Sequence, residues 1–413
     1  MSSVFSIALS SLQAESEAIN TTGHNLANIN TNGFKQSESN FRDLVAASLS
    51  GTSTGLGVAN PVNQQIFSQG PLISSTSPWA AAIQGTGFFV LKQPTGQASY
   101  TRNGNFALSK DGVLQTLTGE NVQGWSATAN GINATVTPSD IILNMGSTVP
   151  PNPTSSLSFT ANLNVAGNPA TGTGNMSVPV QVTDSLGNQH TLSINFTQSN
   201  SANAWGYTVT IPSGDLTGGT GANTTLTSGT LNFNANGTLT AASLAPVAIP
   251  VTGLKDSANN LSISWSLKNV DGSGRITQFA QSSAYNDLVQ DGTAAGKLSD
   301  VGLGDDGQVV ARFSNGEQKT VAQLALATFR NQSTLQDIGN NNFAAGSNTA
   351  QPDIGVSQTG NRGHVLSGQL EGSNVDMAKE FTNLITFQRG YQASSKVITT
   401  ADNMSQDLLN LIR

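Results

Sequence analysis

Apolar residues recur every seven positions near the start of the chain, which predicts an amphipathic helix over residues 4–28. No Pro or Gly interrupts the pattern before Gly23, and the run 28–33 favours a turn that ends the helix. The stripe is narrow, as in helices that pack against other helices. Its members are Phe5, Leu9, Leu12, Ile19 and Leu26.

A second helix is expected at the other end, where about 38 residues run without Pro to Arg413, a length of about 57 Å. Ser373 or Asn374 can serve as its N-cap, with Asp376 and Glu380 near the positive end of the helix dipole. Its stripe consists of Met377, Phe381, Leu384, Tyr391, Ile398, Leu409 and Ile412.

Neither terminal helix should be stable alone, because the first carries many Ser, Thr and Asn and the second contains Gly390. We therefore expect the helices to fold when neighbouring subunits cover their stripes. An ordinary core face is the alternative for any such stripe. The narrow seam at both ends favours assembly, with the helices pairing with each other or with other subunits.

Between the helices the pattern is that of β-strands. Polar and apolar residues alternate over 192–196, 205–211 and 261–267. The segment 321–329 fits either a helix or a strand. Dipeptides typical of tight hairpin turns separate the strands: Asn103-Gly104, Asp111-Gly112, Asn236-Gly237, Asp271-Gly272, Asp306-Gly307 and Asn315-Gly316.

Composition divides this β region, because a Pro-rich linker at 150–153 precedes a stretch, 155–275, with only seven charged residues. We expect a mainly β fold with α-helical termini, in which nested barrel-like or sandwich-like β domains stand on a coiled coil of the two terminal helices. The predicted parts are a terminal helical domain (1–30 and 370–413), a connecting segment (31–70 and 356–369), an inner β domain (71–149 and 276–355) and an inserted outer β domain (150–275).

Charge and composition exclude several functions. The 17 basic and 24 acidic residues give a net charge of −7 with no basic run, which argues against nucleic-acid binding. The chain has no cysteine, so thiol catalysis, disulfides and Cys-ligated metals are impossible. Its histidines, His24, His190 and His364, lie far apart and in no recognisable motif. We predict no enzyme activity, and no catalytic, cofactor or metal site.

Three motifs suggest chemistry but are better explained as turns. The spacing of Gly302, Gly304 and Gly307 matches a dinucleotide loop, but a strand-like segment follows where a helix is required. The run 271–275 resembles a calcium loop, yet Ser282 stands where the bidentate Glu should be. Asp305 and Asp306 are adjacent, so they should diverge rather than converge on one glycosidic bond.

The four tryptophans, Trp79, Trp125, Trp205 and Trp265, lie in apolar segments and are expected in the core rather than stacked on sugars. The first basic residue is Lys35, and no apolar run reaches the length of a membrane span. We therefore expect no membrane insertion, and either an intracellular protein or export without a cleaved signal peptide.

Several segments together resemble the bacterial flagellar rod and hook axial proteins. Residues 8–14 and 24–35 match their N-terminal signature, and residues 370–377 and 387–392 match their C-terminal one. Residues 83–91, 100–106 and 119–125 are similar to the β domain that these proteins share. The N-terminal signature includes the turn residues Asn28, Asn30, Thr31, Gly33, Phe34 and Lys35.

The resemblance implies a structural subunit of a helical homopolymer, outside the cell in the flagellar hook or basal body. The inserted outer domain favours a hook subunit, a flexible universal joint that transmits torque, over a distal rod subunit. Implied partners are further copies of the chain, the distal rod protein, the hook cap protein, the hook–filament junction protein and the type III export apparatus. A secreted β-rich adhesin or carbohydrate-binding protein is the alternative from another class.

Overall fold

The computed structural model describes residues 2–46, 54–128 and 131–411, and these form two compact units. Unit 1 contains the described residues up to 145 together with 300–311 and 318–411, and unit 2 contains 146–299 and 312–317. Strands dominate and helices lie towards both ends of the chain, so the predicted fold class is confirmed.

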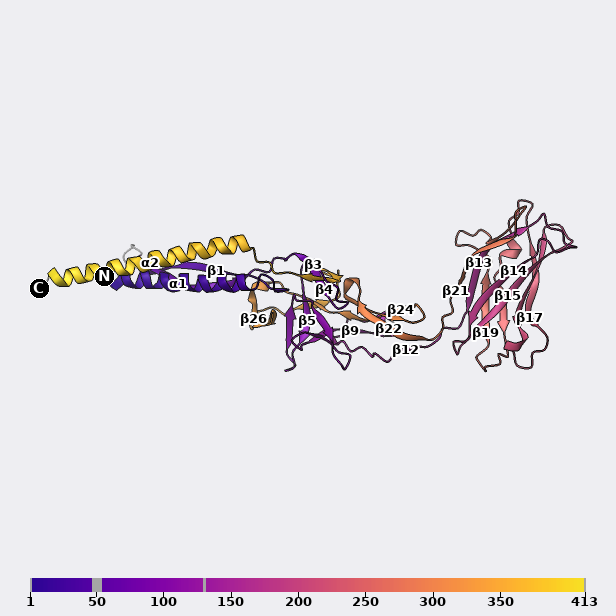
Figure 1. Ribbon diagram of the computed structural model, residues 1–413, viewed down its shortest axis with the longest axis horizontal. Coiled ribbons are helices and arrows are strands. Elements are labelled where there is room, and N and C mark those ends of the chain that lie inside the picture. Colours follow the sequence, from indigo (N-terminus) through magenta and orange to yellow (C-terminus); the bar gives the residue numbers. More distant parts are fainter. Residues whose placement is uncertain (1, 47–53, 129–130, 412–413) are drawn as a thin grey trace. The chain divides into compact units, whose positions relative to one another are not determined.

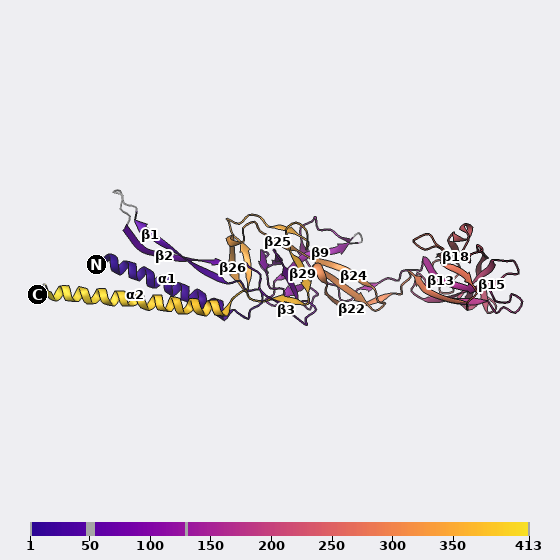
Figure 2. The ribbon, with the colours of Figure 1, turned by 90° about the horizontal axis from the view of Figure 1, so that it is seen from above.

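Unit 1 begins and ends with the two long helices α1 (Ser2–Ala27) and α2 (Met377–Leu411). They run antiparallel and side by side in both views (Figures 1 and 2). The N-cap of α2 differs from the prediction. Asp376 caps this helix, because its Oδ1 accepts hydrogen bonds from the amides of Ala378 at 2.8 Å and Lys379 at 3.1 Å.

A long antiparallel hairpin, β1 (Ser37–Ala46) and β2 (Thr54–Gln65), occupies most of the predicted connecting segment. It lies along α1 (Figure 2). Asn63 Nδ2 donates to Glu17 Oε1 of α1 at 3.0 Å, and the backbone amide of Val58 donates to Ser10 Oγ at 3.2 Å. The hairpin therefore packs on α1 as well as leading from it towards the β domain.

A sheet of unit 1 interleaves strands from both halves of the chain, with the path β24-β9-β5-β6-β27-β26. The strands before the insertion are β3 (Leu72–Ser74), β4 (Ala81–Gln84), β5 (Phe88–Lys92), β6 (Ala98–Thr101), β7 (Phe106–Leu108), β8 (Leu114–Thr116), β9 (Asn121–Thr128), β10 (Gly131–Ile132) and β11 (Ser139–Asp140). Those after it are β22 (Gly296–Leu303), β23 (Gln308–Phe313), β24 (Gln318–Leu324), β25 (Leu326–Thr328), β26 (Leu335–Gly339), β27 (Asn342–Ala345), β28 (Asp353–Gly355), β29 (His364–Ser367) and β30 (Gln369–Glu371).

Aromatic side chains from both halves close this domain. Phe88 of β5 lies edge-to-face with Phe343 of β27, with ring centroids 5.9 Å apart, and with Phe329 at 5.8 Å. Phe67, which follows β2, packs on Phe88 and Phe343 at 5.5 and 5.2 Å. The segments on either side of the insertion therefore share one core.

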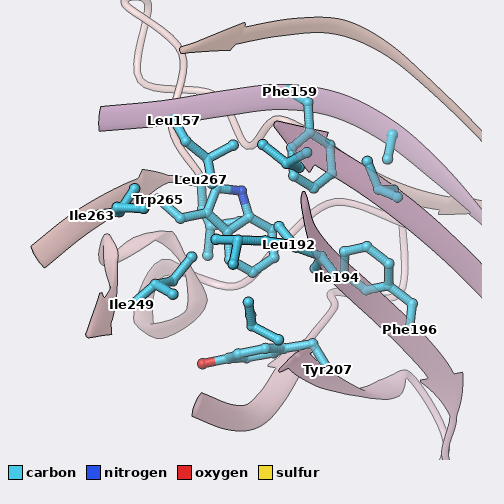
Figure 3. Close-up of a cluster of buried hydrophobic side chains, with 14 of the residues drawn as sticks. Leu157, Phe159, Leu192, Ile194, Phe196, Tyr207, Ile249, Ile263, Trp265 and Leu267 are labelled. Carbon is cyan, nitrogen blue, oxygen red and sulfur yellow. The ribbon is translucent and has the colours of Figure 1, made fainter. Parts of the chain in front are cut away.

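Unit 2 packs a four-stranded sheet against a five-stranded one around an aromatic and aliphatic core (Figure 3). Trp265 is buried at its centre, stacked on Phe159 at 5.3 Å and edge-to-face with Tyr207 at 5.5 Å. The four-stranded sheet contains β14 (Met176–Thr183), β15 (Gln189–Gln198), β16 (Ala204–Pro212) and β17 (Asn223–Asn232). The five-stranded sheet contains β13 (Ser156–Asn164), β18 (Val247–Val251), β19 (Leu261–Ser266), β20 (Ile276–Phe279) and β21 (Ala284–Gln290). The short strand β12 (Thr148–Val149) precedes them.

The outer unit extends further than the predicted 150–275. Strands β20 and β21 both pair with β13, so the unit continues to residue 299 and also takes 312–317. The sequence hides β21 because all its side chains are at least partly exposed, which removes the alternating pattern.

One further segment differs from its prediction, and the structure resolves another that the sequence left ambiguous. Residues 356–369 were expected to connect domains, but β29 within them pairs with β4, so part of this segment belongs to the inner β domain. The ambiguous segment 321–329 is extended, in β24 and β25, because it pairs with β9 on one side and with β5 and β28 on the other.

Candidate functional site

The predicted motif turn lies where the two ends of the chain meet in unit 1. Its backbone is held by hydrogen bonds from the Thr31 amide to the Asn28 carbonyl at 3.2 Å and from the Phe34 amide to the Thr31 carbonyl at 3.3 Å. Gly33 has a φ of 74°, and a Cβ there would lie 2.5 Å from the Asn103 amide nitrogen. Only glycine combines this left-handed backbone with so close an approach. Asn30 is exposed at the tip of the turn.

A buried ionic triad begins directly after this turn. Lys35 Nζ lies 2.5 Å from Glu371 Oε1, and Arg102 Nη1 lies 3.2 Å from Glu371 Oε2. The Lys35 and Glu371 side chains are completely buried, and that of Arg102 is 3% exposed. The triad joins the N-terminal turn, the end of β6 and the end of β30, which directly precedes α2.

Backbone groups and an aromatic ring also contact the triad. Lys35 Nζ also donates to the Ser68 carbonyl at 2.7 Å, and the Gly70 amide donates to Glu371 Oε1 at 3.0 Å. Arg102 Nη2 donates to the Gly85 carbonyl at 2.8 Å, and its guanidinium lies 5.3 Å from the centre of the Phe88 ring.

Burial dominates the electrostatics of the two cations. Desolvation lowers the pKa of both Lys35 and Arg102 from their ordinary values, and the charge of Glu371 opposes that shift. Two cations share one carboxylate, so the removal of Glu371 would leave two buried positive charges without a counter-ion.

Two asparagines extend the junction to the helices. Asn374 Nδ2 donates to the Ile66 carbonyl at 2.7 Å, while its Oδ1 accepts from the Gln36 amide at 2.7 Å. Asn25 of α1 bonds both backbone groups of Ser37 at 2.7 and 2.9 Å and donates to Glu380 Oε2 of α2 at 3.2 Å. Each of these side-chain amides both donates and accepts hydrogen bonds, as a peptide group does. They therefore hold each helix end against the neighbouring strands.

No role was predicted for Glu371, and Asn374 was predicted only as a possible N-cap of the C-terminal helix. An isolated Glu or Asn in a polar stretch carries no periodic signal, and its burial depends on partners more than 300 residues away. The one available signal was Lys35, the first basic residue of a chain with few charges.

The contact between the helices is built from small residues. Ala14 and Ala18 of α1 are almost fully buried, and Ser11 Oγ lies 2.8 Å from Ser394 Oγ of α2. A Cβ at Gly390 would overlap the Glu15 carboxylate, so the Glu15 side chain of α1 occupies the space beside this glycine of α2.

Several of the predicted seam residues remain exposed within this chain. Leu9 and Met377 are 52% and 51% exposed. Phe381 and Tyr391 are also exposed, whereas Phe5, Leu12, Ile19, Leu26, Leu384 and Ile398 are half-buried. The Leu409 side chain and Ile412 lie outside the described residues. Large apolar surface therefore remains uncovered on both helices.

The motifs interpreted as turns are turns in the structure. Gly302 lies in β22, and the turn from Gly304 to Gly307 connects β22 to β23, with φ of 62° at Asp306 and 75° at Gly307. The two acidic side chains have separate partners, because Asp306 Oδ1 lies 2.7 Å from His364 Nδ1, and Asp305 Oδ1 accepts from Ser367 Oγ at 2.9 Å.

The remaining candidates also have structural surroundings. The Asp271 carboxylate accepts from Ser273 within its own turn. Trp125, Trp205 and Trp265 are buried, and Trp79 is half-buried. His24 is exposed and lies edge-to-face with Phe34 at 5.5 Å. No helix among the described residues is long and apolar enough to cross a membrane.

Comparison with known protein families covers most of the chain. Residues 5–35 match the model of the flagella basal body rod protein, and residues 82–165 match that of the flagellar hook protein FlgE/F/G D1 domain. Residues 158–293 match the flagellar basal body protein FlaE D2 domain, and residues 366–411 match the flagellar basal body rod FlgEFG protein C-terminal model.

Whole-length relatives give the same result. The flagellar hook protein FlgE of Borreliella burgdorferi is 31% identical over 451 residues, which cover 100% of this chain and 99% of that protein. The FlgE of Escherichia coli K12 is 32% identical over 421 residues, covering 98% and 99%. The crystal structure of Helicobacter pylori flagellar hook protein FlgE2 covers 72% of this chain and all of that one, with a TM-score of 0.52 and 15% identity, a likeness of fold.

Helical ends joined through a buried junction to nested β domains define a structural axial protein of the bacterial flagellum. Within that class, the chain belongs to the flagellar hook protein family. The hook-subunit interpretation is thereby confirmed, and the distal rod and adhesin alternatives are not favoured.

Proposed function

We propose that this hook subunit polymerises through its terminal helices, which pack with those of neighbouring copies into an inner tube of coiled coils around a channel. The observation that supports this proposal is the apolar surface of α2, where Met377, Phe381 and Tyr391 remain 51%, 45% and 43% exposed. Burial of such side chains contributes about 1.5–3 kcal/mol each. The small-residue contact between α1 and α2 leaves this surface free for other copies.

Export and partners extend the same proposal. A long channel admits only an extended chain, which suits subunits that leave the cell unfolded through the flagellar type III export apparatus. A chain without cysteine cannot be trapped by disulfides on that route. Assembly would then begin on the distal rod protein, proceed beneath the hook cap protein and end at the hook–filament junction protein.

The outer unit supports the bending of a universal joint. A hook that bends while it rotates must change its outer contacts in every turn, so these contacts should be weak. Only seven charged residues between 155 and 275 leave few salt bridges to break and remake. Apolar helix faces can shear slightly while they remain buried.

The test is polymerisation of a chain in which one exposed α2 position carries a charge. Phe381→Asp should abolish tubes in electron micrographs, because burial of an unpaired carboxylate in the helix seam is costly. The matched variant Phe381→Leu keeps an apolar side chain and should still form tubes.

Folding must be checked separately. Phe381 is exposed, so the Asp variant should keep the wild-type near-UV circular dichroism of its β units. Normal tubes from a folded Phe381→Asp protein would refute the proposed seam, as would equal loss of tubes in Phe381→Leu.

A further inference from the structure

The nearly uncharged part of unit 2 gathers most of its acidic residues around one histidine. Between residues 155 and 275 the chain has four acidic side chains and one histidine, His190. Three of the four, Asp184, Asp215 and Asp256, lie within 4 Å of the imidazole nitrogens. In a segment with so few charges, this convergence calls for a physical explanation.

The four residues come from different elements at one end of the unit. Asp184 follows β14, His190 lies in β15, and Asp215 ends the short 3-10 helix η1 (Ser213–Asp215) between β16 and β17. Asp256 lies in the loop between β18 and β19. The first three therefore belong to the four-stranded sheet, and the fourth to the five-stranded sheet.

Both imidazole nitrogens face carboxylates. Nε2 lies 3.0 Å from Asp184 Oδ2 and 3.7 Å from Asp256 Oδ2, and Nδ1 lies 3.3 Å from Asp215 Oδ2. A neutral imidazole has one N–H and one lone pair, so in either tautomer a lone pair would point at a carboxylate. Only the imidazolium ion donates on both sides.

Two of the three carboxylates are held in place by other hydrogen bonds. Asp184 Oδ1 accepts from the amides of Leu186 at 2.8 Å and Asn188 at 2.9 Å. Asp256 Oδ1 accepts from the Ala258 amide at 3.0 Å, and its Oδ2 accepts from Asn188 Nδ2 at 2.9 Å.

Backbone hydrogen bonds join the segment that contains Asp215 to the loop that contains Asp256. The Lys255 amide donates to the Asp215 carbonyl at 2.9 Å, and the Thr217 amide donates to the Gly253 carbonyl at 2.8 Å. Lys255 adjoins Asp256 in the loop and is the cation nearest to the cluster in sequence. His190 is 8% exposed and Asp184 is fully buried, so solvent screens their pairing little.

We propose that His190 is a proton-operated clamp, which in its charged form bridges the two sheets of unit 2 at this end and loosens them when it loses its proton. This role is independent of the helix seam. It makes the rigidity of the outer unit depend on pH between neutral and mildly alkaline conditions.

The direction of titration agrees with this geometry. Burial tends to lower the pKa of His190, but hydrogen bonds and charges of Asp184 and Asp215 outweigh it and raise that pKa above its ordinary value of 6.5. A raised histidine pKa means that the stabilisation is complete below about pH 6.5 and is lost as the pH rises through the folded value.

Asp184 sets the acid limit of the same window. Burial opposes its ionisation, but hydrogen bonds from His190 and from the Leu186 and Asn188 amides lower its pKa below the ordinary 3.8. Its stabilisation is therefore present above about pH 4 and is lost as the pH falls further. The clamp is strongest between about pH 4 and 6.5.

The test uses the full-length soluble chain and the carbon-bound ring protons of its three histidines in NMR. The His190→Gln variant identifies the His190 signal by its absence. We expect that signal to titrate above pH 6.5, and the titration to move downwards in Asp215→Asn, which removes a half-exposed partner. A His190 titration at or below 6.5, or one unaffected by Asp215→Asn, would overturn the proposal.

Hydrogen exchange shows where the unit loosens when His190 loses its proton. In the wild type, protection of β15 and of the loop between β18 and β19, corrected for intrinsic exchange rates, should fall at least about threefold from pH 6 to pH 9. In His190→Gln it should be flat over that range. An equal fall in both proteins would contradict the clamp.

A metal ion is the competing occupant, because ligand atoms of Asp184, His190 and Asp256 all lie within 4.8 Å of one another. After treatment with EDTA, one equivalent of Mn²⁺ or Zn²⁺ should leave the His190 signal unchanged. Selective broadening by Mn²⁺ or a shift with Zn²⁺, abolished by Asp256→Asn, would replace the proton by a metal and refute the proposal.

Discussion

At the scale of single residues, the junction depends on a few polar side chains that the fold buries completely. Glu371 receives both Lys35 and Arg102, and the peptide N–H of Gly70 in addition. A buried ion pair of this kind is weak evidence for added stability, but its disruption is expensive because the remaining charge cannot be solvated. The triad therefore acts as a requirement for correct joining of the two chain ends.

Glu371→Gln should destabilise unit 1 by about 3–5 kcal/mol, because two buried cations lose their counter-ion while shape is preserved. Hydrogen exchange of β5 and β6 in the soluble chain would measure the change. Glu38→Gln, at an exposed position of β1, is the matched control and should leave exchange unchanged. Equal exchange in wild type and Glu371→Gln would show that the triad is dispensable.

Asp291 makes a second residue-scale prediction, in unit 2. Burial opposes its ionisation, but hydrogen bonds from Ser155 and from the Ser156 and Ser155 amides lower its pKa to about 2. A lowered carboxyl pKa gives stability that is present above about pH 4 and is lost as the pH falls towards 2. Asp291→Asn should cost about 1 kcal/mol at pH 7, less than the pKa difference implies, because the side chain is exposed.

Urea unfolding of unit 2 at pH 7, 4 and 3 would test this. The difference between wild type and Asp291→Asn should shrink steadily towards pH 3. Ser155→Ala, which removes one donor, should have a smaller effect in the same direction. A constant difference at all three pH values would contradict the assignment.

At the scale of elements, α1 and α2 have small residues in their contact, while several large apolar side chains on both helices remain exposed. Gly390 lowers the helix propensity of α2 by about 1 kcal/mol relative to Ala, yet it provides the space that Glu15 occupies. Packing and propensity therefore make opposite predictions for its replacement.

Gly390→Ala should raise the critical concentration for polymerisation, because a Cβ meets the Glu15 carboxylate. Turbidity and sedimentation of polymer would measure it. The double variant Glu15→Ala, Gly390→Ala relieves the overlap and should recover assembly. If propensity alone governed the helix, the single variant would assemble more readily than the wild type.

The sequence predicted those elements that have a regular pattern or a specific motif. The helices, the strands around Trp205 and Trp265 and the turn ending at Lys35 are of this kind, and they lie where they were expected. Strand β21 has no buried face and so no alternation. The partners of Glu371 lie hundreds of residues away, and no local pattern contains that information.

The seam illustrates a subtler limit. Heptad spacing selected large residues such as Leu12 and Ile19, but the contacts between the helices within the chain also include Ser11 with Ser394 and Glu15 with Gly390. The periodicity of a helix shows that it has an apolar face. It does not show which element or neighbouring subunit covers each part of that face.

At the scale of the whole molecule, the insertion point of unit 2 is sharply defined. The Asn152 amide donates to the Thr293 carbonyl at 2.9 Å, and the Thr293 amide donates to the Asn152 carbonyl at the same distance. The chain therefore enters and leaves at adjacent positions, so a short linker can replace everything between them.

Replacement of residues 152–293 by a short Gly-Ser linker should leave unit 1 folded and able to form tubes, with altered bending. Deletion of 155–275 should instead aggregate, because β20 and β21 lose their partner β13 and expose unpaired edges. Circular dichroism and electron microscopy of both proteins would measure this. Equal behaviour of the two deletions would contradict the observed boundary.

The central claim, that neighbouring copies cover the terminal helices, is tested most directly by hydrogen exchange of residues 5–26 and 377–407 in monomer and in polymer. Large apolar side chains of both helices stay exposed in the single chain, so these amides should be only weakly protected in a verified monomer. In the polymer they should be protected at least about a hundredfold more. Equal protection in the two states would contradict the account.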